Sequence, residues 1–192
     1  MDSLHATALE DLRSLVLVLL ADYRLAADAV SREESPAGRR AQLRAGLALV
    51  DGAASALRAI ARADVVAGRL SLAAPEAAIL QGEAADLLDD GAPRIRPAFY
   101  SAHRLVKFSF LVGAKAFGVP FAPDLADPGW RDLGVAIGLR HRLIHATEVG
   151  DLLISDTDWA IAIRGIAWFG AELERFVTAV SASAAPPSIR QP

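Results

Sequence analysis

Apolar residues recur at helical spacing along almost the whole chain. A helix places apolar side chains three or four positions apart, whereas a half-buried strand alternates apolar and polar residues. The first pattern appears repeatedly, and no window alternates well enough for a strand. We therefore expect an all-α protein, a single-domain helical bundle of about five to six helices.

Proline, glycine and capping residues divide this pattern into segments. Ser35 followed by Pro36 is typical of a helix start, because a hydroxyl caps the first turn and proline is favoured at its first position. Ser155, with Asp158 three residues later, resembles a capping box. The expected helices cover about residues 4–30, 36–68, 75–90 with a stop at Gly91, 99–117 opened by Pro97 and ended by Gly118, 130–145, and a last segment from 156 onward.

The last segment carries an apolar stripe at helical spacing, which predicts that it packs across the helix of residues 130–145. The stripe consists of Trp159, Ile163, Ile166, Phe169, Leu173, Phe176 and Val180. No internal repeat or linker divides the chain. We expect one helical domain over residues 1–183 and a disordered tail over 184–192, where three prolines follow Ala184.

Composition narrows the class of protein. Hydrophobic residues make up 53% of the 192 positions and charged residues 22%, which is typical of a soluble globular domain. The chain has no cysteine, so disulfides and thiolate metal sites are excluded. Its longest aliphatic run, Leu15 to Leu20, is far shorter than the roughly 20 residues that span a bilayer. We expect a cytoplasmic protein without a membrane partner.

Charge is unevenly distributed along the chain. The formal net charge is −3, but residues 94–145 carry 8 basic and 3 acidic residues. No acid lies between Gly91 and Pro123, a stretch that contains His103, Arg104 and Lys107. Such a run is often only a solvated helix face. Its position just before the histidine-rich segment described next favours a local anion site.

The sequence Arg-His-Arg-Leu-Ile-His, residues 140–145, places two imidazoles and two guanidinium groups in one short segment. On an ideal helix Gly134, Gly138, His141 and His145 share one strip, with Arg131 and Arg142 beside it. Arg140 lies about 140° away from His145, so one helix does not bring these two side chains together. A second copy related by a two-fold axis near the strip would do so, which predicts a homodimer.

The stretch from about Ile79 to Leu173 resembles the HEPN superfamily (higher eukaryotes and prokaryotes nucleotide-binding). Arg140 and His145 match its motif of an arginine followed, a few positions later, by a histidine, and His141 stands where asparagine is more common. Residues 151–156 and the Trp168-Phe169 pair are similar to a bacterial variant of the family. Ala146 replaces the proline that often follows the motif histidine.

This resemblance implies metal-independent RNA cleavage at a cleft formed by two paired domains, with no cofactor. Arg140, His145 and His141 would be catalytic, because transphosphorylation needs proton transfer and positive charge on the phosphate. A toxin or defence effector of this kind would have RNA as its substrate and an antitoxin or regulatory protein as a further partner. The expected RNA-binding residues are Arg142, Arg131, His103, Arg104 and Lys107.

Other interpretations of the motif stay open. His145 alone is typical of a cation at a helix C-terminus, where the dipole favours it. His141 and His145 have the spacing of two metal ligands, but no third ligand is fixed by the sequence, and we expect no metal. A non-catalytic helical module that binds RNA, a nucleotide or a partner protein would use the same residues as a nuclease.

Overall fold

The computed structural model describes residues 3–87 and 92–184. Over these ranges the chain forms an all-α, single-domain bundle with one small hairpin, as expected from the helical periodicity. The elements in chain order are α1 (Ser3–Arg32), α2 (Pro36–Val66), α3 (Ala74–Gln81), β1 (Glu83–Leu87), β2 (Pro93–Pro97), α4 (Ala102–Phe117), α5 (Pro128–Ile144), the 3₁₀ helix η1 (Val149–Leu152) and α6 (Asp156–Ala184).

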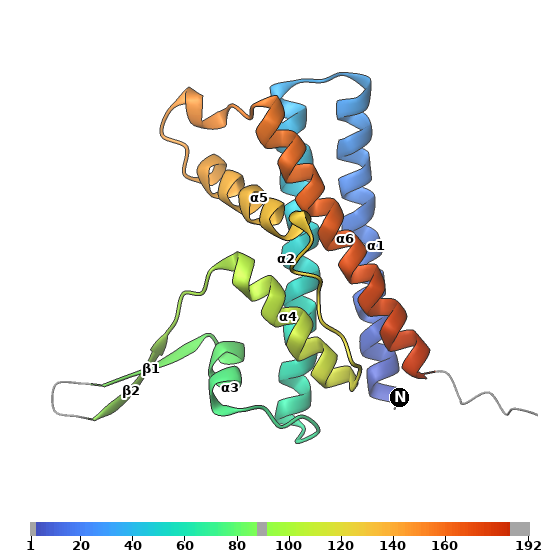
Figure 1. Cartoon of the computed structure of the whole chain (residues 1–192), viewed down its shortest axis with the longest axis vertical. Coiled ribbons are helices and arrows are strands. Elements are labelled where there is room, and N and C mark those ends of the chain that lie inside the picture. Colours follow the sequence, from blue (N-terminus) through green and yellow to red (C-terminus); the bar gives the residue numbers. More distant parts are fainter. Residues whose placement is uncertain (1–2, 88–91, 185–192) are drawn as a thin grey trace, which may run out of the picture.

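The two first helices form a long pair, and the others pack around α2 (Figure 1). Helix α4 lies against α2, and α6 packs across α5, which confirms the contact expected from the apolar stripe of the last segment. The predicted caps are also confirmed. Ser35 Oγ accepts a hydrogen bond from the Gly38 N–H at 3.1 Å, and Ser155 Oγ accepts one from the Asp158 N–H at 3.1 Å.

The region between α3 and α4 departs from the prediction. Helix α3 ends at Gly82, which adopts the left-handed conformation with φ of 74°, and not at Gly91. Strands β1 and β2 follow as an antiparallel hairpin, with Ala84 opposite Arg96, that projects from the bundle (Figure 1). The expectation of no strand was therefore wrong here. Cross-strand pairing stabilises a segment whose own sequence, Glu-Ala-Ala-Asp-Leu, carries no alternation.

The sequence pattern also predicted the start of α4 too early in the chain. Pro97 is the last residue of β2, and the helix begins only at Ala102. A proline without an N–H is tolerated at the end of an edge strand as well as at the start of a helix. The presence of a proline alone therefore did not distinguish the end of a strand from the start of a helix.

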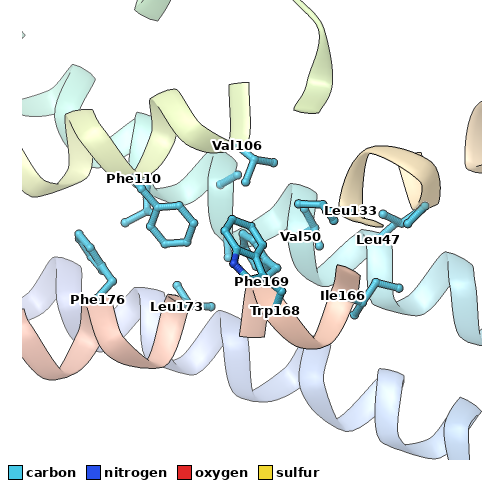
Figure 2. Close-up of a cluster of buried hydrophobic side chains, with 14 of the residues drawn as sticks. Leu47, Val50, Val106, Phe110, Leu133, Ile166, Trp168, Phe169, Leu173 and Phe176 are labelled. Atoms are coloured by element: carbon cyan, nitrogen blue, oxygen red, sulfur yellow. The ribbon is translucent and has the colours of Figure 1, made fainter. Parts of the chain in front are cut away.

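Aromatic residues of α4 and α6 form the centre of the core (Figure 2). Phe110, Phe169 and Phe176 are fully buried, with the Phe110 ring centroid 5.6 Å from that of Phe169 and 6.0 Å from that of Phe176. Leu133 of α5 and Val50 of α2 complete this cluster. The core thus fixes α5 between α2 and α6, and with it the orientation of the candidate site.

Helices α5 and α6 approach each other closely at Gly165 of α6. A Cβ atom added there would lie 2.3 Å from the backbone nitrogen of Leu133, so only glycine fits at this crossing. Gly138 belongs to the strip that the sequence placed near an expected two-fold axis. Among the described residues, no atom lies within 4 Å of a Cβ atom added at Gly138.

Two further expectations concern the C-terminal tail and membrane-spanning helices. The predicted tail over residues 184–192 lies outside the described residues, except that Ala184 is the last residue of α6. No helix in the described part of the chain is long and apolar enough to cross a membrane.

Candidate functional site

The Arg140–His145 segment forms the C-terminal end of α5. The helix starts where the Asp127 side chain accepts a hydrogen bond from the Gly129 N–H at 2.7 Å, with Pro128 in the first turn. It ends at His145, whose N–H donates to the His141 carbonyl at 3.1 Å. The last turn therefore carries the basic side chains, where the helix dipole stabilises cations.

The two histidines lie on the exposed side of this last turn. The ring centroids of His141 and His145 are 4.5 Å apart, and the rings are tilted by 53° to each other. Both side chains are exposed, as is Gly138 one turn earlier. Three of the four predicted strip residues therefore share an open face, and none of these three is buried in the core of the protomer.

Gly134, the fourth residue of the strip, has a structural role. The ring of His103 from α4 would lie 3.3 Å from a Cβ atom at this position. That ring stacks on Trp130 with centroids 3.6 Å apart, and its Nε2 lies 2.8 Å from the Trp130 carbonyl oxygen. Burial lowers the pKa of His103 below its ordinary value, although the hydrogen bond to the Trp130 carbonyl opposes this. His103 thus joins α4 to α5.

Arg140 points to the other side of α5, as helical geometry predicted. Its guanidinium forms a half-exposed ion pair with Asp51 in the middle of α2. Sequence reasoning missed Asp51, because it lies 89 positions away and no motif surrounds it. Within one chain, Arg140 and the histidine pair therefore occupy opposite sides of the same helix end.

The segment after His145 is fixed by Asp151. Its carboxylate accepts hydrogen bonds from the backbone N–H groups of Thr147 at 2.9 Å and Glu148 at 3.2 Å. These two bonds lower the pKa of the Asp151 carboxyl. Arg142 lies 3.9 Å from Asp158 at the start of α6. A compact turn thus follows the histidine pair directly.

The remaining predicted binding residues are exposed but spread over two helices. Arg104 and Lys107 lie on α4, and Arg131 lies in the first turn of α5. Among residues 3–87 and 92–184, no group of three or more His, Asp or Glu side chains is placed to hold a metal ion. In the last turn of α5, the Arg140–His145 segment supplies imidazole and guanidinium groups as its ionisable side chains.

The segment from the end of α5 to the start of α6 carries three exposed apolar side chains. Ile144 is 59% exposed, Val149 77% and Leu153 55%. Large apolar residues on a surface commonly mark an interaction site when they form a patch. Ile144 directly precedes His145, so apolar surface is exposed beside the histidine pair.

No family model matches the chain, and no curated protein or solved structure is significantly similar to it. The exposed imidazoles at the end of α5 can accept and donate protons, and the neighbouring guanidinium groups can bind an anion.

Proposed function

We propose that the chain is a metal-independent endoribonuclease of the kind that the HEPN resemblance implies, acting as a toxin or defence effector. The observation that carries this proposal is the exposed His141–His145 pair, with ring centroids 4.5 Å apart at the end of α5. Packing does not explain two adjacent histidines on an open face. Such a role implies action in the cytoplasm, where RNA is available.

The chemistry needs proton transfer at two oxygens. A base removes the proton of a ribose 2′-OH, whose oxygen attacks the adjacent phosphorus. The bond from phosphorus to the 5′ oxygen breaks, and an acid returns a proton to that leaving oxygen. The products are a 2′,3′-cyclic phosphate and a free 5′-OH. His145 and His141 are suited to the proton transfers, and Arg140 to stabilising charge on the phosphate oxygens.

The proposed site is shared between two copies of the chain. Arg140 lies on the α2 side of α5, paired with Asp51, whereas His141 and His145 are exposed on the other side. A two-fold axis near the end of α5 brings Arg140 of one protomer to the histidine pair of the other. The exposed Ile144, Val149 and Leu153 provide apolar area for such an interface, or for an antitoxin or regulatory protein.

One observation favours a second candidate, a binding module without catalysis. The charge of Arg140 is already matched by Asp51 within the same chain. A site that binds RNA, a nucleotide or a partner without cleaving it does not need this arginine near the histidines. RNA binding without cleavage by the wild-type protein supports this alternative.

The test is cleavage of single-stranded RNA in the presence of EDTA. We expect a 2′,3′-cyclic phosphate product, and we expect His145→Ala to lower the rate by about 100-fold to 10,000-fold, the usual cost of losing a general acid or base. Arg140→Ala should lower it by about 100-fold or more, as does removal of a group that stabilises the transition-state charge.

The matched control is Arg24→Ala, which removes an exposed arginine from α1. It should retain wild-type activity, and circular dichroism should show that all three variants keep their helical content. Cleavage that persists in both α5 variants, or that requires a divalent metal, contradicts the proposal.

A further inference from the structure

The exposed face of α2 carries a row of arginines. With 100° between successive residues of a helix, positions 40, 44, 51, 55, 58 and 62 fall within an arc of about 60°. We call this set the α2 stripe; it contains Arg40, Arg44, Asp51, Ser55, Arg58 and Arg62. Alanines at 41, 48 and 59 are exposed beside it, so the neighbouring positions of α2 carry only small side chains.

Three of these arginines are anchored by uncharged oxygens. Arg58 donates hydrogen bonds to the hydroxyl oxygens of Ser109 at 2.5 Å and Ser55 at 2.9 Å. Arg62 donates to the Leu80 carbonyl at 2.6 Å, and Arg40 to the Leu152 carbonyl at 3.1 Å. Such partners orient a guanidinium group without neutralising its charge, and they leave other N–H groups for an anion.

Three arginines elsewhere in the bundle are held differently. Arg69 donates twice to Asp64, Arg164 to Asp132 and Arg175 to Glu172, in each case to a carboxylate that is largely buried. Each of these pairs is neutral overall. In the described part of the chain, no carboxylate lies within ion-pair distance of the four stripe arginines.

The one acid within the α2 stripe balances only one arginine of the row. Asp51 forms its ion pair with Arg140 of α5, so it brings a fifth arginine to the row. Burial and, after it, the charge of Arg62 lower the pKa of Arg58, whereas the charge of Asp51 opposes this shift without reversing it. A row of like charges destabilises the surface of a protein unless an anion neutralises it.

We propose that the α2 stripe, together with Arg140, binds the phosphate backbone of single-stranded RNA. The choice of RNA rests on the proposed function. The row leads to the candidate site, because Arg140 lies at its centre and Arg40 reaches the Leu152 carbonyl in η1, shortly after His145 along the chain. The stripe therefore guides a strand along α2 to the end of α5.

The composition of the stripe argues against a membrane surface. Helices that lie on membranes bury large apolar residues beside their cations. Here the intervening exposed positions are alanine and serine. A phosphate backbone needs only closely spaced cations and room to approach, which small side chains provide.

The test measures binding separately from cleavage. The probe is a fluorescein-labelled 2′-O-methyl oligouridylate, which lacks the free 2′-OH needed for cleavage and reports binding by anisotropy. The variant is Arg44→Ala/Arg62→Ala, since both side chains are exposed and lie outside the catalytic segment. Its control is Arg24→Ala/Arg32→Ala, which removes two exposed arginines from α1 and the same net charge.

We expect the stripe variant to bind at least about tenfold more weakly at low salt, while the control binds as the wild type does. The slope of log K against log salt concentration should fall in magnitude by about 1.4, because each lost phosphate contact contributes about 0.7 for a single strand. Arg44→Glu alone should weaken binding in the same direction, which guards against a folding defect in the double variant.

Equal weakening in the stripe variant and its control would overturn the proposal. Binding of polyglutamate or of phosphatidylserine vesicles through the same arginines, with no binding of the oligouridylate, would overturn it as well. The proposed function is judged separately. Loss of cleavage in His145→Ala with normal binding through the stripe supports both, whereas stripe-dependent binding by a wild-type protein that cleaves no RNA retains the stripe and rejects the nuclease.

Discussion

The two sides of α5 differ in burial: one side packs against other helices, and the other side is exposed. On the side that faces α6 and α2, Leu133 and Ala136 are fully buried and Gly165 of α6 lies against the backbone. On the other side Gly138, His141 and His145 are exposed, and no atom in the described part of the chain lies within 4 Å of a Cβ atom added at Gly138. One helix thus carries a packed face and an open face.

This difference separates residues explained by folding from residues that need another explanation. Helix packing explains the residues of the packed face, because α5 and α6 can meet only where the apolar side chains interlock and Gly165 leaves room for the backbone of α5. On the open face, a glycine makes the helix less stable than an alanine would, and the two exposed histidines contribute little to the stability of the fold. The open face is therefore where we expect binding and chemistry.

The largest effect should come from adding one methyl group to the packed face. Gly165→Ala places a Cβ atom 2.3 Å from the Leu133 backbone nitrogen, so α5 and α6 must separate. We expect the free energy of unfolding to fall by about 3 kcal/mol or more, at the upper end of overpacking effects. Gly138→Ala, on the open face, should instead raise it by about 0.5–1 kcal/mol. Urea denaturation measures both, and similar destabilisation of the two variants would contradict the contrast.

A larger side chain at Gly138 should act on assembly without affecting the fold. The position is open among the described residues, and leucine is nearly as good a helix former as alanine, so Gly138→Leu should raise the unfolding free energy of the monomer about as much as Gly138→Ala does. If the strip lies at a two-fold axis, the leucine should shift the protein from dimer to monomer. Light scattering after size exclusion tests this. A wild-type monomer, or a variant that stays dimeric at equal concentration, would argue against an interface at this strip.

The smallest predicted effect concerns the junction of α4 with α5. Burial holds the pKa of His103 below that of the unfolded chain, which is near 6.5. As the pH falls below about 6.5, the unfolded chain binds this proton first, so stability decreases until the pH passes the folded pKa. His103→Gln should flatten this part of the profile. Thermal unfolding between neutral and mildly acidic pH measures it, and parallel profiles for both proteins would rule the explanation out.

The helical architecture could be predicted because its signals are local. Helical periodicity and the caps at Ser35 and Ser155 depend on residues close in sequence, and the structure confirmed them. The hairpin of β1 and β2 could not be predicted, since its stability comes from pairing between two separate segments, Glu83–Leu87 and Pro93–Pro97. Local pattern therefore identified the bundle but not its small sheet.

The candidate site divides in the same way. The shared strip of Gly138, His141 and His145, and the opposite direction of Arg140, follow from helix geometry alone. The sequence did not reveal Asp51 or the α2 stripe, because the first half of the chain is acidic overall. The stripe can be recognised only in the folded structure, which shows the hydrogen-bond and ion-pair partner of each charged side chain. Ion pairing is a tertiary property, and formal charge along the sequence does not report it.

In the proposed dimer, Arg140 of one protomer and the histidines of the other form one site. It is tested most directly by mixing Arg140→Ala with His145→Ala, each inactive alone, and measuring RNA cleavage after subunit exchange. Half of the dimers should then be mixed, each with one intact site, and about a quarter of wild-type activity should return. If no activity returns although light scattering shows dimers and exchange is complete, the shared site is contradicted.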